Sequence, residues 1–152
     1  MNPRYRATAQ RHRVLFGLII LFCALFGLTL GVSAQTKVHK VIFVITSPDR
    51  DEWPVVTTLA EHFLAGIKPE PADVEVLSYG PSIPILAKGS PVAKEVADLE
   101  KQGVHFVACA NAMRAHHIAE ADLLPGVTSV PSGVVELVRK QEAGYIYVKA
   151  GR

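Results

Sequence analysis

The sequence has 152 residues, and its 16 lysines and arginines against 14 acidic residues give a formal net charge of +2. The basic excess belongs to the N-terminal segment, which contains four arginines and no acidic residue, and no basic cluster follows it. Because nucleic-acid binding requires a clustered basic face, we do not expect a nucleic-acid partner.

Residues 1–34 have the pattern of an export signal. The four arginines are followed by an unbroken apolar run from Val14 to Val32. The small residues that end at Ala34 suit a signal peptidase, so we predict cleavage before Gln35 and a periplasmic product. The alternative is an uncleaved inner-membrane anchor, because about 20 apolar residues span a bilayer. We expect membrane association only in that case.

The remaining residues, 35–152, are expected to form one domain, because they suffice for one core and are too few for two. Removing four arginines from the 16 basic residues leaves 12 against 14 acidic ones, a net charge of about −2. Cys23 lies in the leader, so Cys109 is the only cysteine of this domain. An internal disulfide is therefore excluded, and packing must stabilise the fold.

The first strand and helix follow directly. Residues 39–46, "HKVIFVIT", form a continuous run of mainly β-branched and aromatic residues, which predicts a strand buried on both faces as in a parallel sheet. A polar loop with Pro48 and Pro54 comes next. Apolar residues at helical spacing then predict a helix over 55–67.

The middle of the chain repeats this order. Residues 72–80 alternate as a second strand, and 81–91 read as a loop with a short ordered turn. A helix is predicted over 90–103, with Ser90 as its N-cap and a glycine at its end. A third strand is predicted over 104–110.

The C-terminal part continues the alternation. Its pattern predicts a helix over 111–124, a short strand over 127–131, a helix over 132–144 and a fifth strand over 145–150. Alternating strands and helices indicate an α/β fold, a three-layer sandwich with helices on both faces of a mostly parallel five-stranded sheet.

Cys109 is the main candidate for chemistry, because it ends the third predicted strand and open α/β sheets bind ligands at the carboxyl ends of their strands. The free N–H groups of the following helix favour a thiolate, and we expect partial exposure. The loop after the first strand would place Asp49 and Trp53 at the same pocket, where Asn111 offers an amide. The alternative is a packing residue, since free cysteine is often buried.

Other chemical motifs are not found. His116 and His117 are adjacent on a predicted helix and point about 100° apart, so they cannot easily chelate one ion. The loop after the first strand lacks the glycines of a phosphate-binding turn. We therefore expect neither a metal ion nor a cofactor.

The sequence resembles the DsrE/DsrF-like family. The resemblance is carried by "HKVIFVI", "VEVLSYG", "LEKQGVHFVACANAM" and the tail "LLPGVTSVPSGVVELVRKQEAGYIYVKAG". It implies a compact α/β fold with a five-stranded parallel sheet, assembly into homotrimers or homohexamers, and in some members a cysteine that carries a persulfide in sulfur relay.

Cys109 falls roughly where the sulfur-carrying members of that family hold their cysteine. The resemblance therefore implies a sulfurtransferase-type persulfide carrier with a sulfur donor or acceptor protein as partner. A non-catalytic oligomeric binding or assembly module with Cys109 buried is the alternative. A dimer linked through Cys109 is a third reading, because a lone exported cysteine can pair between chains.

Overall fold

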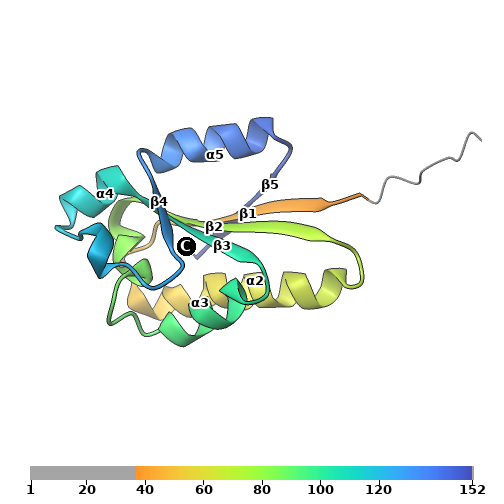
Figure 1. The fold of residues 1–152 in the computed structure, drawn as a ribbon, viewed down its shortest axis with the longest axis horizontal. Helices are drawn as coiled ribbons and strands as arrows, with labels where there is room; N and C mark the ends of the chain where they lie inside the picture. The colour runs from red at the N-terminus through yellow and green to blue at the C-terminus, as the bar shows by residue number, and fades with distance from the viewer. Residues whose placement is uncertain (1–36, 152) are drawn as a thin grey trace, which may run out of the picture. The chain divides into compact units, whose positions relative to one another are not determined.

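Five parallel strands form the centre of the computed structural model, which describes residues 37–151 (Figure 1). The strands are β1 (His39–Ile45), β2 (Ala72–Ser78), β3 (Val104–Cys109), β4 (Thr128–Val130) and β5 (Ile146–Ala150). Their order in the sheet is β4-β3-β2-β1-β5, and every neighbouring pair is parallel. The predicted five-stranded sheet is confirmed. The predicted signal peptide and its cleavage site lie outside the described residues.

Helices cover both faces of the sheet, as the alternating pattern predicted. The α-helices are α2 (Trp53–Ile67), α3 (Ala93–Glu100), α4 (Ala110–Ala115) and α5 (Gly133–Glu142). Short 3-10 helices are η2 (Arg50–Glu52), η3 (Gly80–Leu86) and η4 (Glu120–Asp122). Figure 1 shows α2 and α3 on one face of the sheet and α5 on the other. Every helix between residues 37 and 151 is too short or too polar to serve as a membrane span.

The core is divided by the sheet into two unequal parts. Phe43 of β1 packs in the larger part, which α2 and α3 complete, while its neighbour Ile42 packs in the smaller part on the other face. Both side chains are buried, which explains the continuous apolar run of β1. Of the helices between residues 37 and 151, α5 covers the smaller part, and His105 of β3 on that face is exposed.

Helix α4 is shorter than the predicted helix over 111–124. It ends at Ala115, and His117 then takes a left-handed conformation with φ of 54°. The N–H of Ile118 donates to the carbonyl of Met113 at 2.9 Å, which satisfies a carbonyl at the helix end. The apolar residues near 124 belong instead to a segment whose Leu124 N–H donates to the carbonyl of Leu86.

Helix η3 corresponds to the short ordered turn predicted within the loop over 81–91, and it lies at the carboxyl end of the sheet. The hydroxyl of Ser82 donates to the carbonyl of Ile45 at 2.7 Å, at the end of β1. Its oxygen also lies 2.8 Å from the hydroxyl of Ser78, the last residue of β2. These buried hydrogen bonds fix η3 to the ends of the two strands.

Candidate functional site

Cys109 is the last residue of β3 and the N-cap residue of α4. Its strand pairs it with Val130 of β4, while Ala112 and Met113 of α4 pack into the same core. Only 6% of its surface is exposed, so the thiol is buried and not partly accessible as expected. The thiol is less exposed than expected because the segments that follow the two neighbouring strands, β2 and β4, cover the end of β3.

Helix α5 begins beside Cys109. A Cβ atom at Gly133 would lie 3.2 Å from the Cβ of Cys109 and 2.8 Å from the Cβ of Tyr79. The second distance is shorter than real Cβ contacts allow, so the missing side chain at Gly133 lets the start of α5 pack directly on both residues. We call Cys109, Tyr79 and Gly133 the thiol site.

The thiol site has a defined electrostatic character. The first N–H groups of a helix have no partner within the helix, and they form the positive end of its dipole. Ser132, the N-cap residue of α5, makes no side-chain hydrogen bond to them. An anion at the start of α5 is therefore favoured, and the side chain of Cys109 begins beside that point.

Tyr79 and Gly133 were not predicted from the sequence. Tyr79 follows β2 and Gly133 follows β4, and these two strands flank β3 in the sheet. The strand order β4-β3-β2 therefore brings them to Cys109. Hydrophobic periodicity marks where each strand ends but does not order the strands. The one local signal was the glycine at the start of a predicted helix.

Trp53, predicted as a pocket residue, is buried at the start of α2. Its indole N–H donates to the carbonyl of Ser47 at 3.2 Å, and the guanidinium of Arg50 lies 5.1 Å from its ring centroid. These contacts close the loop after β1. Neither contact involves Cys109, so a binding role for Trp53 stays a prediction.

Asp49 and Asn111 are both exposed and engaged with their own neighbours. The carboxylate of Asp49 accepts the N–H of Asp51 at 3.0 Å and caps η2. The side-chain oxygen of Asn111 accepts a hydrogen bond from Arg114 one turn later in α4. Neither contact reaches the thiol. The loop of Asp49 follows β1, which β2 separates from β3, about 10 Å away at the usual strand spacing.

Among residues 37–151, no group of three or more histidine, cysteine or acidic side chains is arranged to hold a metal ion. His116 is the C-cap residue of α4, and His117 follows it in a left-handed conformation.

A charge pair is enclosed between the sheet and α5. The Lys140 ammonium lies 2.5 Å from the buried carboxylate of Glu75, and 3.9 Å from Glu136. The other oxygen of Glu75 is buried without a hydrogen-bond partner. Burial raises the pKa of Glu75, and the hydrogen bond from Lys140 offsets this only in part. Burial alone would lower the pKa of Lys140, but Glu75 outweighs it and the pKa is raised.

The arrangement is that of an α/β protein with an all-parallel five-stranded sheet and a cysteine at the carboxyl end of β3. Among solved structures, it is similar to the protein of unknown function MTH1491 from Methanobacterium thermoautotrophicum, with 32% sequence identity and a TM-score of 0.69. That alignment covers 73% of this chain and 98% of that chain.

Two more distant structures share the fold. The ychN protein from E. coli is 13% identical with a TM-score of 0.61, over 73% of this chain and 98% of that one. The conserved protein of unknown function BT1422 from Bacteroides thetaiotaomicron is 16% identical with a TM-score of 0.58, over 78% and 98%. No curated protein matched the sequence.

Residues 39–150 match the DsrE/DsrF-like family, which is nearly all of the described chain. The protein therefore belongs to this family, as the sequence motifs predicted.

Proposed function

We propose that the protein is a sulfur carrier that holds a sulfane sulfur on Cys109 as a persulfide. The observation that carries the proposal is the packing of the α5 N-terminus on Cys109, which Gly133 makes possible. Membership of the DsrE/DsrF-like family supports it, because a sulfur-relay role is a property of some members. A persulfide is more acidic than a thiol, and its anion suits the positive end of a helix.

The transfer needs no external oxidant. The Cys109 thiolate attacks the outer sulfur of a donor persulfide, R–S–S–H. The donor S–S bond breaks, R–S⁻ leaves with the bonding electron pair, and Cys109 becomes Cys–S–S–H with the proton kept on the transferred sulfur. An acceptor thiolate reverses these steps. The sulfane sulfur keeps its oxidation state throughout, so Cys109 acts as a relay and is regenerated.

Access to the thiol is the main requirement of this proposal, because Cys109 is only 6% exposed. On the α5 side, the backbone of Gly133 covers Cys109. Gly133 has no side chain that would have to move to expose the thiol. A small shift of the start of α5 would therefore open a path to the sulfur. We propose that the donor enters there, between Tyr79 and Gly133.

Intact mass measurement tests the proposal. The full chain, with its two cysteines, is incubated with glutathione persulfide and its mass compared with that of the untreated protein. We expect a gain of one sulfur atom that persists in Cys23→Ser and disappears in Cys109→Ser. A gain seen only after denaturation, or one that follows Cys23, would contradict the proposal.

A non-catalytic oligomeric module is the second candidate function, favoured by the burial of Cys109 and by apolar side chains left exposed on one surface. These residues are Val134, Val135 and Val138 of α5 and Tyr147 of β5, which is on the α5 side of the sheet because its register partner Ile42 packs there. We call them the α5–β5 apolar surface. We propose that it joins copies of this chain into a homotrimer or homohexamer. In this reading Cys109 is a packing residue and transfers no sulfur.

We further propose that the protein is exported to the periplasm with cleavage between Ala34 and Gln35. The basic start and the apolar run described above support this, and the alternative is an uncleaved inner-membrane anchor. N-terminal sequencing of the purified protein distinguishes the two, since a sequence beginning near Met1 would favour the anchor.

A further inference from the structure

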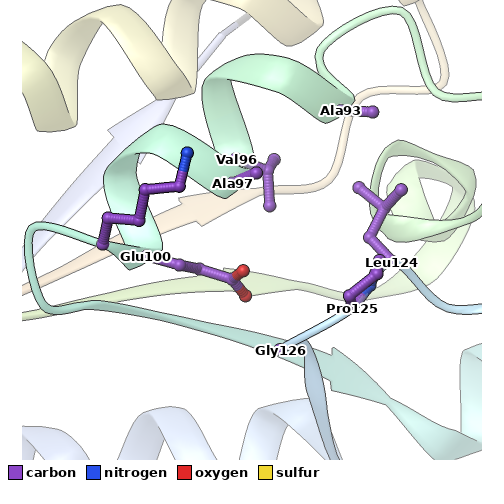
Figure 2. A pocket seen from close by; sticks show the side chains of 8 residues that line it. Ala93, Val96, Ala97, Glu100, Leu124, Pro125 and Gly126 are labelled. Atoms are coloured by element: carbon purple, nitrogen blue, oxygen red, sulfur yellow. The ribbon is translucent and has the colours of Figure 1, made fainter.

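A cavity of about 440 Å³ opens between α3 and the segment that leads into β4. Its volume lies in the range of about 300–1,000 Å³ typical of small-molecule sites. The apolar part of its lining consists of Ala93, Val96, Ala97, Leu124 and Pro125. Figure 2 shows these side chains around the cavity. It lies near the start of β3, whereas the thiol site lies at the end of that strand.

Glu100 brings a carboxylate into this apolar cavity. Figure 2 shows its side chain extending from the end of α3 towards Gly126. The Oε1 atom is buried and has no hydrogen-bond partner. Burial raises the pKa of this carboxyl, as expected for a charge that no neighbour compensates. A carboxylate with one buried and unpaired oxygen is unfavourable, so a ligand that donates a hydrogen bond to this carboxylate would stabilise it.

Gly126 provides the room for this carboxylate. Its backbone has a φ of +89°, a conformation that side chains disfavour, and a Cβ there would lie 2.6 Å from the Cδ of Glu100. A second cavity of about 200 Å³, bordered by His105 and Thr128, lies along the same carboxylate. Glu100 therefore lies against the backbone of Gly126, and both cavities border its side chain.

The residues between 37 and 151 supply no cation to Glu100. Lys101 also borders the larger cavity, but its ammonium lies 2.8 Å from the carboxylate of Asp98 and is largely exposed. Among the ion pairs of residues 37–151, none includes Glu100. An incoming positive group would therefore meet a carboxylate that has no competing partner.

We infer that the cavity between α3 and the Leu124–Gly126 segment binds a small organic cation, an ammonium or guanidinium group on an aliphatic body. The cation donates hydrogen bonds to Glu100, and the body packs on the apolar lining of Val96 and Leu124. Charge-assisted hydrogen bonds of this kind are among the stronger ones in proteins. The site is independent of Cys109 and of the proposed sulfur transfer.

Cyclohexylammonium is a suitable probe, because its ring is compact and aliphatic and its ammonium is a single donor group. Its binding to the full chain is measured by calorimetry, with cyclohexanol and cyclohexanecarboxylate as neutral and anionic analogues of similar shape. We expect saturable binding of the cation, binding of the alcohol about tenfold weaker or worse, and no binding of the anion. Equal binding of the cation and the alcohol would overturn the inference.

Matched variants identify the site. Glu100→Gln keeps the shape of the side chain and is expected to weaken cyclohexylammonium binding about tenfold, since it removes a charged partner. Glu95→Gln, at an exposed carboxylate of the same helix, should leave binding unchanged. Ala97→Leu should weaken it by filling part of the cavity.

Stability separates loss of binding from loss of folding. Burial disfavours the ionised form of Glu100, and Glu100→Gln removes this carboxylate. The Tm of the variant is therefore expected to equal or exceed that of the unchanged protein. The inference is overturned if Glu100→Gln and Glu95→Gln bind the probe alike, or if Ala97→Leu binds it as tightly as the unchanged chain. Persulfide formation at Cys109 is a separate measurement and is expected to proceed in all three variants.

Discussion

The pair of Glu75 and Lys140 places a charge where the smaller core would otherwise be apolar. Glu75 lies on β2 beside buried Leu77, and Lys140 reaches it from α5. Three charged or titratable groups face the carboxylate: Lys140 and Glu136 from α5, and His105 from β3. Lys140 is the group in hydrogen-bond contact with it, so the ionised form of Glu75 depends mainly on one neighbour.

Lys140→Met should destabilise the fold in a pH-dependent manner. Methionine keeps most of the aliphatic stem, so the loss of free energy of unfolding, about 1–3 kcal/mol at pH 7, comes from leaving Glu75 without its charged partner. The pKa of Glu75, already raised by burial, rises further in the folded variant. Folding of the variant then takes up protons. The loss of free energy of unfolding in Lys140→Met therefore grows as the pH rises above the ordinary glutamate pKa of 4.5 and shrinks below that pH.

Urea denaturation at pH 4.5 and pH 7 measures this effect. Lys94→Met is the matched control, because Lys94 pairs with Asp98 on the exposed side of α3 and such pairs contribute little. A deficit for Lys140→Met that is the same at both pH values would show that Glu75 does not cause it.

The sequence identified Cys109 and its position at the end of a strand, because an apolar run that gives way to helical spacing marks such a junction. It did not identify Tyr79 and Gly133 as neighbours, because their proximity depends on strand order. It also overestimated the exposure of the thiol. Burial depends on what the flanking loops cover, and local patterns do not contain that information.

Helices α4 and α5 show how much an element depends on its surroundings. The apolar residues after Ala115 continue at near-helical spacing, yet the chain leaves the helix because Leu124 pairs with Leu86 in backbone hydrogen bonding. Tertiary pairing therefore overrides the local preference of that segment. The start of α5, in contrast, is where the helix was predicted, and its glycine has a packing role.

Gly133→Ala should destabilise the protein by about 1–3 kcal/mol, because the added methyl group forces α5 away from Tyr79 and Cys109. Gly66→Ala is the matched control. Gly66 lies in the last turn of α2 with nothing near its absent side chain, so alanine should stabilise the protein by about 0.5–1 kcal/mol. Urea denaturation of both variants gives the two free energies, and equal stability of Gly133→Ala and the unchanged chain would exclude close packing at the start of α5.

The overall fold could be predicted from the sequence more completely than the contacts of single residues or the ends of helices. Alternating strand and helix patterns fixed the class, the five strands and the presence of helices on both faces of the sheet. Residues 39–46 were recognisable as a strand buried on both faces because their run of β-branched and aromatic residues is continuous, and β1 is observed over His39–Ile45. The order β4-β3-β2-β1-β5 was not predictable in the same way, since it is set by packing between distant segments.

The α5–β5 apolar surface leads to a prediction about assembly. Val134 is 56% exposed and Val138 is 50% exposed, and they lie one turn apart on α5. Val138→Asp would place a charge in the contact that we propose between copies, so light scattering should show a smaller particle than for the unchanged chain. Ala65→Asp, at an exposed position of α2 on the opposite face of the sheet, is the control and should leave the particle size unchanged.

A monomer for the unchanged chain at high concentration would remove the assembly proposal. Identical particle sizes for Val138→Asp and the unchanged oligomer would show that copies meet through another surface.

The pairing of β5 with β1 joins the last strand of the domain to its first. Ile146 of β5 lies opposite Val41 of β1, about a hundred residues earlier in the chain. During synthesis, β1 emerges from the ribosome long before its β5 partner exists, and contacts between such distant segments form slowly. Until then one side of β1 presents unpaired backbone groups to other strands, including those of neighbouring nascent chains. Sheet formation is therefore completed only after the residues of β5 have been synthesised.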